Sequence, residues 1–303
     1  MMISVVIPLY NKERQIAETL RSVLQQSFLD FEIVVVNDGS TDGSVAAAES
    51  VQDERIRIIH QENAGVSAAR NRGIEEARYE FIAFLDADDR WKSDYLQTQY
   101  ELTQKYPECS VFACNYEFVH ADGSVHPTII RKLPFEEENG ILSNYFEVAS
   151  CSHPPMWTSA VMVRKEVIQS IGGFPVGIKS GEDLLTWARL ACRGKIAYSR
   201  DALAEFHMEG YQRGDKPKRR PDETDQVGRE LTRLLDDRGQ VGTRKYLSLW
   251  YKMRASIYLR LGERLACLKE CAKSLRYNPA NIKVVVIAVL ACVPEKIRKF
   301  ILR

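Results

Sequence analysis

The sequence lacks long apolar stretches, a basic leader and regularly spaced cysteines. No apolar run in its 303 residues approaches the ~18–20 residues that span a bilayer, so no integral membrane helix is predicted. The first residues place no basic segment ahead of an apolar core, so no secretory signal is expected. Seven cysteines at irregular spacings predict neither a disulfide framework nor a paired CxxC zinc site. We therefore expect a cytoplasmic protein with reduced thiols.

Charge is divided unevenly along the chain, although the net charge is only +1. From Tyr211 onward there are 22 Lys and Arg against 10 Asp and Glu, whereas the preceding residues carry 20 against 31. This division predicts an acidic part suited to a metal and a basic part suited to an anionic surface, with a chance imbalance as the alternative. The basic part has no interleaved aromatic motif, which argues against nucleic-acid binding.

Strand and helix patterns alternate over the first ninety residues. Short β-branched runs predict strands at 3–8, 31–36, 56–60 and 81–85, with helices at 12–26, 45–51 and 66–78 between them. Strands joined by single helices form a parallel sheet, and ligands bind at the carboxyl ends of such strands. Polar residues follow the first, second and fourth strands, so we expect a site there.

The later part of the chain has a mixed α+β pattern, then a polar loop, then helices. Helices are predicted at 94–105 and 182–192, and strands at 110–118 and 159–164. Two helices that meet at Gly262 resemble one tetratricopeptide unit, without the further copies that a solenoid needs. The predicted parts are an α/β domain (1–210), a basic loop and linker helix (211–243), and a helical hairpin with an apolar and basic tail (244–303).

The strongest chemical signal is Asp86-Ala87-Asp88, at the end of the fourth predicted strand. Side chains two apart on an extended backbone point to the same side, so both carboxylates face one place. Two adjacent carboxylates repel one another unless a cation lies between them, and hard divalent cations prefer oxygen ligands. The alternative is an acidic cap, in which Asp88 or Asp89 accepts N–H groups of the next helix.

Two further segments follow the second and third strands. In the turn from Asn37 to Asp42, the last three residues are suited to cap the following helix. Capping does not explain Asp38, which is expected at the tip of the second strand. A carboxylate there would accept a hydrogen bond from a nucleobase N–H. In the segment 63–73, Arg70 lies one turn inside a helix, where it would pair with a carboxylate or a phosphate. An exposed Arg on a capped helix is the alternative.

Together these motifs resemble the family 2 inverting glycosyltransferases with a GT-A fold. The matching segments are Val5-Val6-Ile7-Pro8-Leu9-Tyr10-Asn11, Asn-Asp-Gly-Ser-Thr-Asp, Asn-Ala-Gly…Ala-Arg-Asn-Arg-Gly and Leu-Asp-Ala-Asp-Asp, with Gly181-Glu182-Asp183 as a later one. The resemblance implies an α/β nucleotide-sugar-binding domain with a mostly parallel sheet, followed by a small C-terminal helical region. One departure is Asn37, where the family commonly has a second Asp.

The resemblance also implies roles for single residues. It places the base of a nucleoside-diphosphate sugar, with uridine commonest, against Pro8, Tyr10 and Asp38. It places the ribose and a Mg²⁺ or Mn²⁺ ion at Asp86 and Asp88, with the metal on the diphosphate.

Two acidic residues and one histidine complete the predicted site. The resemblance assigns the catalytic base to Asp183, with Glu182 beside it, whereas the plain structural alternative is that the pair complements a helix N-terminus. His207 is a candidate ligand of the metal or diphosphate, and a surface or core histidine is its alternative. The segment 153–157 either lines an acceptor pocket or forms a rigid turn with a core Trp157, and we favour the turn.

The resemblance therefore implies a metal-dependent inverting glycosyltransferase and, by analogy with the family, a role in surface polysaccharide biosynthesis. Such an enzyme would move a hexosyl or N-acetylhexosaminyl group from a UDP-sugar to a hydroxyl of a saccharide or lipid-linked saccharide. A sugar nucleotidyltransferase would carry a Gly-rich basic loop after the first strand, where Leu9-Tyr10-Asn11-Lys12-Glu13 stands. A non-catalytic nucleotide-sugar-binding protein would be expected to have lost Asp88 or Asp183.

The apolar segment 282–293 is too short to span a bilayer, and Lys283, Lys296, Arg298, Lys299 and Arg303 flank it. It either lies in a membrane interface with its basic residues near anionic headgroups, or packs against the preceding helices or a homodimer partner. The first alternative places the protein peripherally on the inner face of the membrane.

Overall fold

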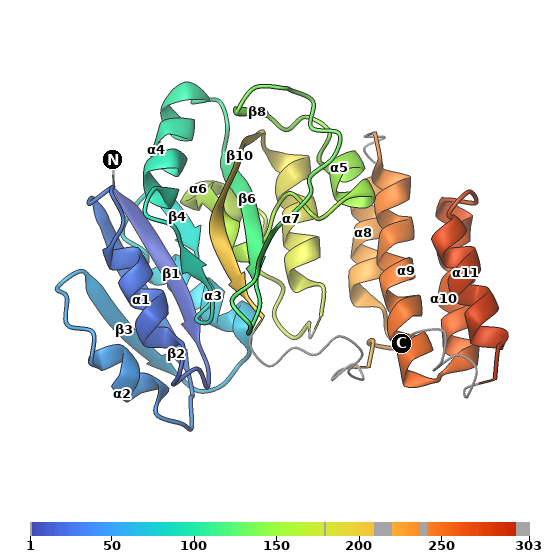
Figure 1. The fold of residues 1–303 in the computed structure, drawn as a ribbon, viewed down its shortest axis with the longest axis horizontal. Helices are drawn as coiled ribbons and strands as arrows, with labels where there is room; N and C mark the ends of the chain where they lie inside the picture. The colour runs from blue at the N-terminus through green and yellow to red at the C-terminus, as the bar shows by residue number, and fades with distance from the viewer. Residues whose placement is uncertain (1, 179, 209–219, 237–240, 295–303) are drawn as a thin grey trace. The chain divides into compact units, whose positions relative to one another are not determined.

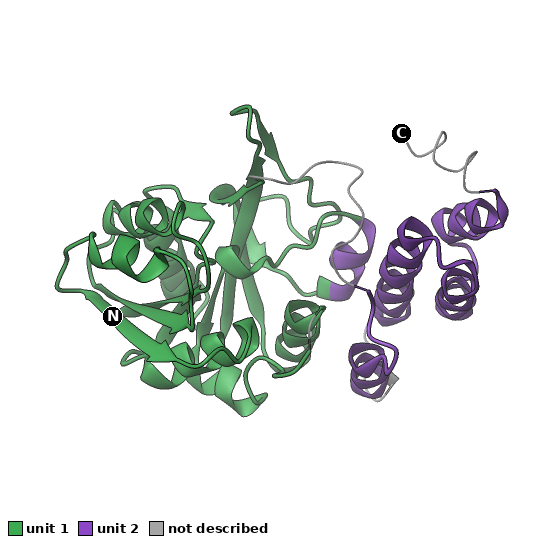
Figure 2. Cartoon of the chain, turned by 90° about the horizontal axis from the view of Figure 1, so that it is seen from below, with its two compact units in different colours: residues 1–145, 152–209 green, residues 146–151, 210–303 purple. Residues whose placement is uncertain are grey.

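The computed structural model describes residues 2–178, 180–208, 220–236 and 241–294 (Figure 1). The chain forms two compact units, coloured in Figure 2: residues 1–145 with 152–209, and residues 146–151 with 210–303. Residues 211–219 and 237–240 of the predicted basic loop and linker helix (211–243) lie outside the described residues, as do the basic residues at 296–303.

One mixed sheet runs through the first unit, in the order β3-β2-β1-β4-β9-β6-β10-β5, with β7 paired to β6 and β8 paired to β10. Its strands are β1 (Ile3–Leu9), β2 (Phe31–Asp38), β3 (Ile56–Gln61), β4 (Phe81–Phe84), β5 (Arg90–Trp91), β6 (Val111–Val119), β7 (Val125–Pro127), β8 (Asn139–Ile141), β9 (Val161–Arg164) and β10 (Ile196–His207).

The first four strands are parallel, as the alternating pattern predicts. Single helices connect them: α1 (Ile16–Leu24), α2 (Ser44–Glu49) and α3 (Val66–Glu76). β9 runs antiparallel between β4 and β6, and β6 is parallel to β10. The sheet is therefore mixed, with four parallel and five shorter antiparallel pairings, and the carboxyl ends of β1, β2 and β4 lie on one edge.

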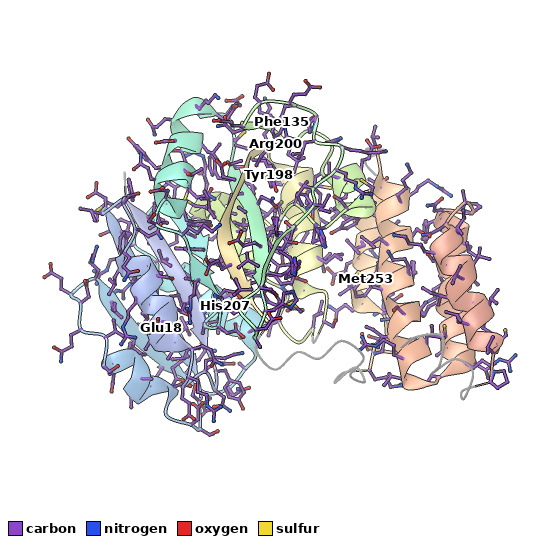
Figure 3. The ribbon with its side chains drawn as sticks, in the orientation of Figure 1. Glu18, Phe135, Tyr198, Arg200, His207 and Met253 are labelled. Carbon is purple, nitrogen blue, oxygen red and sulfur yellow. The ribbon has the colours of Figure 1, made fainter. Side chains whose placement is uncertain are left out.

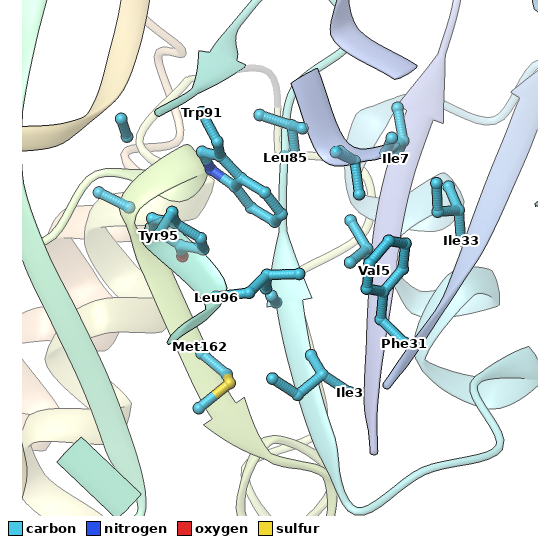
Figure 4. Packing of buried hydrophobic residues seen from close by; sticks show 14 of the residues in the cluster. Ile3, Val5, Ile7, Phe31, Ile33, Leu85, Trp91, Tyr95, Leu96 and Met162 are labelled. Atoms are coloured by element: carbon cyan, nitrogen blue, oxygen red, sulfur yellow. The ribbon is translucent and has the colours of Figure 1, made fainter. Parts of the chain in front are cut away.

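The core lies on both faces of β1, because this strand is apolar at nearly every position. Ile3, Val5 and Ile7 belong to a buried cluster that includes Trp91 and Tyr95 (Figure 4). Val6 points to the opposite face, where α3 packs. Gly73 of α3 has no side chain there, and a Cβ atom on it would lie 2.2 Å from Val6 Cγ1. The helix that carries Arg70 is therefore held close to the central strand.

The remaining helices of the first unit are α4 (Tyr95–Lys105), a short 3₁₀ helix (Thr158–Ala160), α6 (Lys165–Ser170) and α7 (Glu182–Arg193). α4 packs on β6 and β10. β10 is the main element that the sequence pattern did not predict. Its pairing with β6 shifts register between Ser199 and Ala202 and again before Ala204, and these irregularities break the simple alternation of side chains.

The second unit is helical. It contains α8 (Gln226–Asp236), α9 (Thr243–Leu261), α10 (Arg264–Tyr277), α11 (Ile282–Cys292) and most of α5 (Tyr145–Cys151). Residues from the three last helices form its apolar cluster. Within the described ranges, no helix has both the length and the apolar character that a bilayer crossing requires. All seven cysteines are free, as their spacing predicts.

Candidate active site

Two loops at the carboxyl edge of the sheet are joined by side-chain hydrogen bonds. In the β1–α1 loop, Asn11 has a left-handed backbone (φ 51°), and its Oδ1 accepts the N–H of Thr41 at 2.8 Å. The N–H of Lys12 donates to Ser44 Oγ at 2.6 Å. The polar segment between β2 and α2 thus forms hydrogen bonds with the β1–α1 loop in addition to leading into α2.

Pro8 and Tyr10 differ in their exposure to a ligand. Pro8 is buried at the end of β1, beyond Val6–Phe84, which is the last pair that β1 forms with β4. Because Pro8 lies beyond the residues that pair with β4, its lack of a backbone N–H removes no hydrogen bond between β1 and β4. Tyr10 lies just after the strand and is 47% exposed, so its ring is available to a bound molecule.

Asp38 is buried at the end of β2, and its carboxylate is bonded to the segment that leads into α3. It accepts the N–H groups of Ala64 and Gly65, both at 2.9 Å, and the side-chain amide of Gln61 at 2.7 Å. Gly65 has φ 91°, a conformation that favours glycine. Asp38 therefore fixes the entry of α3, and its contact with a nucleobase stays a prediction.

Arg70 is buried one turn inside α3 and pairs with Asp86. Its Nη2 donates to Asp86 Oδ1 at 2.6 Å, and its guanidinium lies 5.0 Å from the ring centre of Phe174. The Nε and Nη1 atoms have no hydrogen-bond partner among the described residues. The structure thus confirms a carboxylate partner for Arg70 and excludes the alternative of an exposed arginine.

The other two acids after β4 have different surroundings. Asp88 forms an ion pair with Lys12, and both side chains are about a third exposed. Asp89 is fully buried and accepts the hydroxyl of Ser159 at 2.5 Å and the N–H of His207 at 3.3 Å. Asp89 does accept an N–H group, but from β10 rather than from the following helix.

Glu182 and Asp183 form the first turn of α7, after Gly181 (φ 85°). Asp183 Oδ1 accepts the N–H of Leu184 at 2.7 Å. Burial is the main cause that raises the pKa of both carboxyls; the nearby Asp86 adds to the rise and the Arg70 guanidinium opposes it. The structure therefore brings the acidic pair close to Arg70 and Asp86, which lie roughly 100 residues earlier in the chain.

His207 is the last residue of β10, far from Tyr198 near the start of that strand (Figure 3). Its Nε2 lies 3.2 Å from Glu205 Oε2, and this hydrogen bond lowers the pKa of Glu205. The side chain is 11% exposed. His207 therefore reaches the carboxyl edge of the sheet, with Glu205 as its partner.

The predicted metal ligands are not gathered into one site. Among the residues that the structure describes, no group of three or more His, Cys, Asp or Glu is placed to hold a metal ion. Each of the three predicted ligands has the partner named above. The carboxylates of Asp86 and Asp88 are 28% and 32% exposed and offer the hard oxygen donors that Mg²⁺ and Mn²⁺ prefer. The donor chemistry of these two carboxylates fits a divalent cation, and metal binding by Asp86, Asp88 and His207 stays a prediction.

Aromatic side chains lie beside the acidic pair. The rings of Tyr116 and Trp157 stack with centres 5.5 Å apart, and the Tyr116 hydroxyl donates to the Pro154 carbonyl at 3.2 Å. Asp183 is near enough to contribute to the raised pKa of Tyr116, for which burial is the main cause. Trp157 is only partly buried, so the segment 153–157 combines a packed turn with an aromatic surface.

Two residues of the site were not identified from the sequence. Lys12 enters the sequence-based expectations only as part of the loop that argues against a sugar nucleotidyltransferase. A lysine after one strand and two acids after another strand of the same sheet are nevertheless a signal for an ion pair. Ser159 also donates its hydroxyl to Asp89 and accepts the N–H of Asp86 at 3.1 Å. It comes about 70 residues later in the chain, so no local pattern could place it.

Comparisons of sequence agree with this geometry. The family model described as Glycosyl transferase family 2 matches residues 4–172. A putative teichuronic acid biosynthesis glycosyltransferase, TuaG of Bacillus subtilis, is 31% identical over 237 residues, which are 77% of this chain and 89% of the relative. Putative glycosyltransferase EpsH of the same organism is 43% identical over 116 residues, 38% of this chain and 33% of the relative.

Solved structures show the same fold. TarS of S. aureus, residues 1–349 in complex with UDP-GlcNAc, has a TM-score of 0.68 at 19% identity, covering 96% of this chain and 90% of TarS 1–349. The mannosyltransferase PcManGT of Pyrobaculum calidifontis, in complex with GDP-Man and Mn²⁺, has a TM-score of 0.57 at 20% identity, covering 98% and 82%. The chain therefore belongs to glycosyl transferase family 2 and is a glycosyltransferase with the GT-A fold.

Proposed function

We propose that the protein is a metal-dependent inverting glycosyltransferase of surface polysaccharide biosynthesis. It transfers a sugar from a nucleoside diphosphate, UDP in the first instance, to a hydroxyl of a saccharide or lipid-linked saccharide. The observation that carries the proposal is the approach of α7, which begins with Glu182 and Asp183, to the Arg70–Asp86 ion pair. The ring of Phe174 contacts both sides: it lies 5.0 Å from the Arg70 guanidinium and 5.6 Å from the Trp187 ring of α7. In this proposal the donor lies at Asp86 and Asp88, and a carboxylate of the neighbouring acidic pair takes the proton of the acceptor.

Asp183 acts as the general base in this proposal. Inverting transfer needs one carboxylate that removes the proton of the acceptor hydroxyl as its oxygen attacks the anomeric carbon from the far side. A pKa above the ordinary value makes a carboxylate a stronger base, and burial raises the pKa of Asp183. Glu182 is the neighbouring alternative, with a pKa raised for the same reason.

Other residues of the edge would hold the donor. Tyr10 offers an exposed ring to the base, and Pro8 and Asp38 shape the strand ends beside it. Asp86 and Asp88 would hold Mg²⁺ or Mn²⁺, which supplies positive charge for the leaving diphosphate when bound. Arg70 holds Asp86 in place and has two further buried N–H groups without a partner among the described residues.

The donor and acceptor classes rest on relatives. TarS is a structural neighbour whose complex contains UDP-GlcNAc, which supports a UDP-sugar donor, and TuaG is named for teichuronic acid biosynthesis, which supports a surface polysaccharide acceptor. PcManGT binds GDP-Man with Mn²⁺, which supports a divalent cation. The family match favours glycosyl transfer over both sugar nucleotidyl transfer and non-catalytic binding.

A donor screen with two matched variants tests the proposal. Purified protein is incubated with a panel of nucleotide sugars and Mn²⁺, and release of the nucleoside diphosphate is measured. With the donor so found, Asp183→Asn should lower turnover by about 10²-fold or more while donor affinity barely changes. Glu182→Gln is the matched control and should retain more of the turnover.

The opposite order of the two variants would move the base to Glu182. Full turnover in excess EDTA would remove the metal from the mechanism. If no sugar of the panel yields a nucleoside diphosphate, but added pyrophosphate converts one of them into a nucleoside triphosphate and a sugar 1-phosphate, the reaction is nucleotidyl transfer instead.

A further inference from the structure

Helix α11 presents an apolar stripe in the second unit that is exposed among the described residues. Its inner face packs on α9 and α10, with Val284 fully buried and Ala291 nearly so. The opposite face carries four exposed apolar residues. Their exposed fractions are 76% for Ile282, 46% for Val285, 50% for Val286 and 59% for Val289. The three valines follow Ile282 by three, four and seven residues, and this spacing puts all four residues on one side of the helix. We call these four residues the α11 stripe.

Positive charge lies beside the stripe. Lys283 is the one charged residue in the sequence of α11, and it is exposed. Lys252 of α9 is close enough that the charge of Lys283, together with burial, lowers its pKa. An occupant of the stripe therefore meets the positive charge of Lys283 at its border.

The size of the stripe decides between kinds of occupant. α11 has 11 residues, so it is about 16 Å long, and the stripe is a single row on it. A stable dimer buries ~1,200–2,000 Å² in total, which is more than one such row supplies. A membrane interface, in contrast, needs only one apolar helix face that enters by ~5–10 Å, with basic residues at its edge.

We propose that the α11 stripe binds membrane surfaces that contain anionic lipid, with α11 lying in the plane of the interface and Lys283 at the level of the headgroups. Valine and isoleucine side chains enter the acyl boundary, and the lysines contact the anionic headgroups. This inference does not rest on the proposed transfer reaction.

Flotation of the full-length protein with lipid vesicles tests the proposal. The vesicles are phosphatidylcholine alone or phosphatidylcholine mixed with phosphatidylglycerol, at low and high salt. Val286→Gln combined with Val289→Gln removes apolar contact without a change of charge, and should weaken binding by about tenfold or more. The matched control, Leu29→Gln with Ile129→Gln, alters two exposed apolar residues of the first unit and should bind as the wild type does.

A third variant separates charge from apolar contact. Lys283→Gln should weaken binding about fivefold on the anionic vesicles only, because a lysine near such a surface contributes about 1 kcal/mol. Equal flotation of the stripe variant and the wild type, or no flotation of either, would overturn the proposal. So would a dimer in analytical ultracentrifugation that the stripe variant dissociates while vesicles bind neither protein. Donor hydrolysis, measured without vesicles, reports on the transfer reaction separately.

Discussion

Lys12 and Arg70 reach two neighbouring carboxylates from different loops of the sheet edge. Arg70 is buried and its partner Asp86 is mostly buried, whereas Lys12 and Asp88 are both about a third exposed. The sequence predicted the acids and Arg70, because motif and strand end coincide there. It could not predict which cation faces which acid, because that depends on how loops far apart in the chain approach one another.

The Lys12–Asp88 pair leads to a prediction about metal affinity. Because a metal ion on Asp88 must replace the ammonium group, Lys12→Met should bind Mn²⁺ about two- to fivefold more tightly, the range for a partly exposed ion pair. Free Mn²⁺ is measured by electron paramagnetic resonance during titration. Lys105→Met removes the same charge from α4, beside Asn139, and is the control for long-range electrostatics. Unchanged or weaker binding by Lys12→Met would contradict a shared site on Asp88.

The raised pKa of Asp183 predicts a dependence of stability on pH. Between the unfolded and the folded pKa the native state holds more protons, so the contribution of this group to the free energy of unfolding falls as pH rises. Asp183→Asn avoids this cost and should raise the melting temperature at neutral pH. The gain should vanish at a pH below both values, where the carboxyl is protonated in both states. A melting temperature equal to that of the wild type at neutral pH would show that burial does not disfavour the carboxylate.

At the scale of elements, the four parallel strands and their helices were predictable because each has a simple apolar period. β10 was not, because Arg200 and Asp201 interrupt its apolar residues at the bulge. This strand carries His207 to the edge of the sheet and bonds the buried Asp89. The position of that part of the site follows from non-local pairing with β6, which no single segment encodes.

The close packing of α3 on β1 gives a prediction at this scale. Gly73→Ala would place a methyl group against Val6, so the helix must shift or the strand must yield. We expect a loss of about 1–3 kcal/mol in the free energy of unfolding, the usual cost of overpacking, measured by urea denaturation. Arg72→Ala, on the exposed side of the same helix, should change stability by less than about 0.5 kcal/mol. Equal stability of Gly73→Ala and wild type would mean that α3 is held less closely than described.

At the scale of the whole molecule, each unit has its own core, and the second also has a buried network of charges. Arg254 donates to Glu270 at 3.0 Å and to the Asp222 carbonyl at 2.8 Å, and lies 3.6 Å from Asp225. Arg254→Met would leave two buried carboxylates without this partner, which costs about 3–5 kcal/mol. Hydrogen exchange should accelerate in α9 and α10, while β1 and β4 keep their protection. Equal acceleration in β1 and β4 would show that the two units unfold together.

The path of the chain through the second unit has a consequence for synthesis. Residues 146–151 belong to that unit, yet they precede the rest of it by about 60 residues. Phe146 packs against Tyr246, with ring centres 5.2 Å apart, so the first ring leaves the ribosome 100 residues before the second. At ~5–20 residues per second, this interval is about 5–20 s. During that time a nascent chain carries an apolar helix whose partner has not been made, so this surface is open to non-native association until α9 has been synthesised.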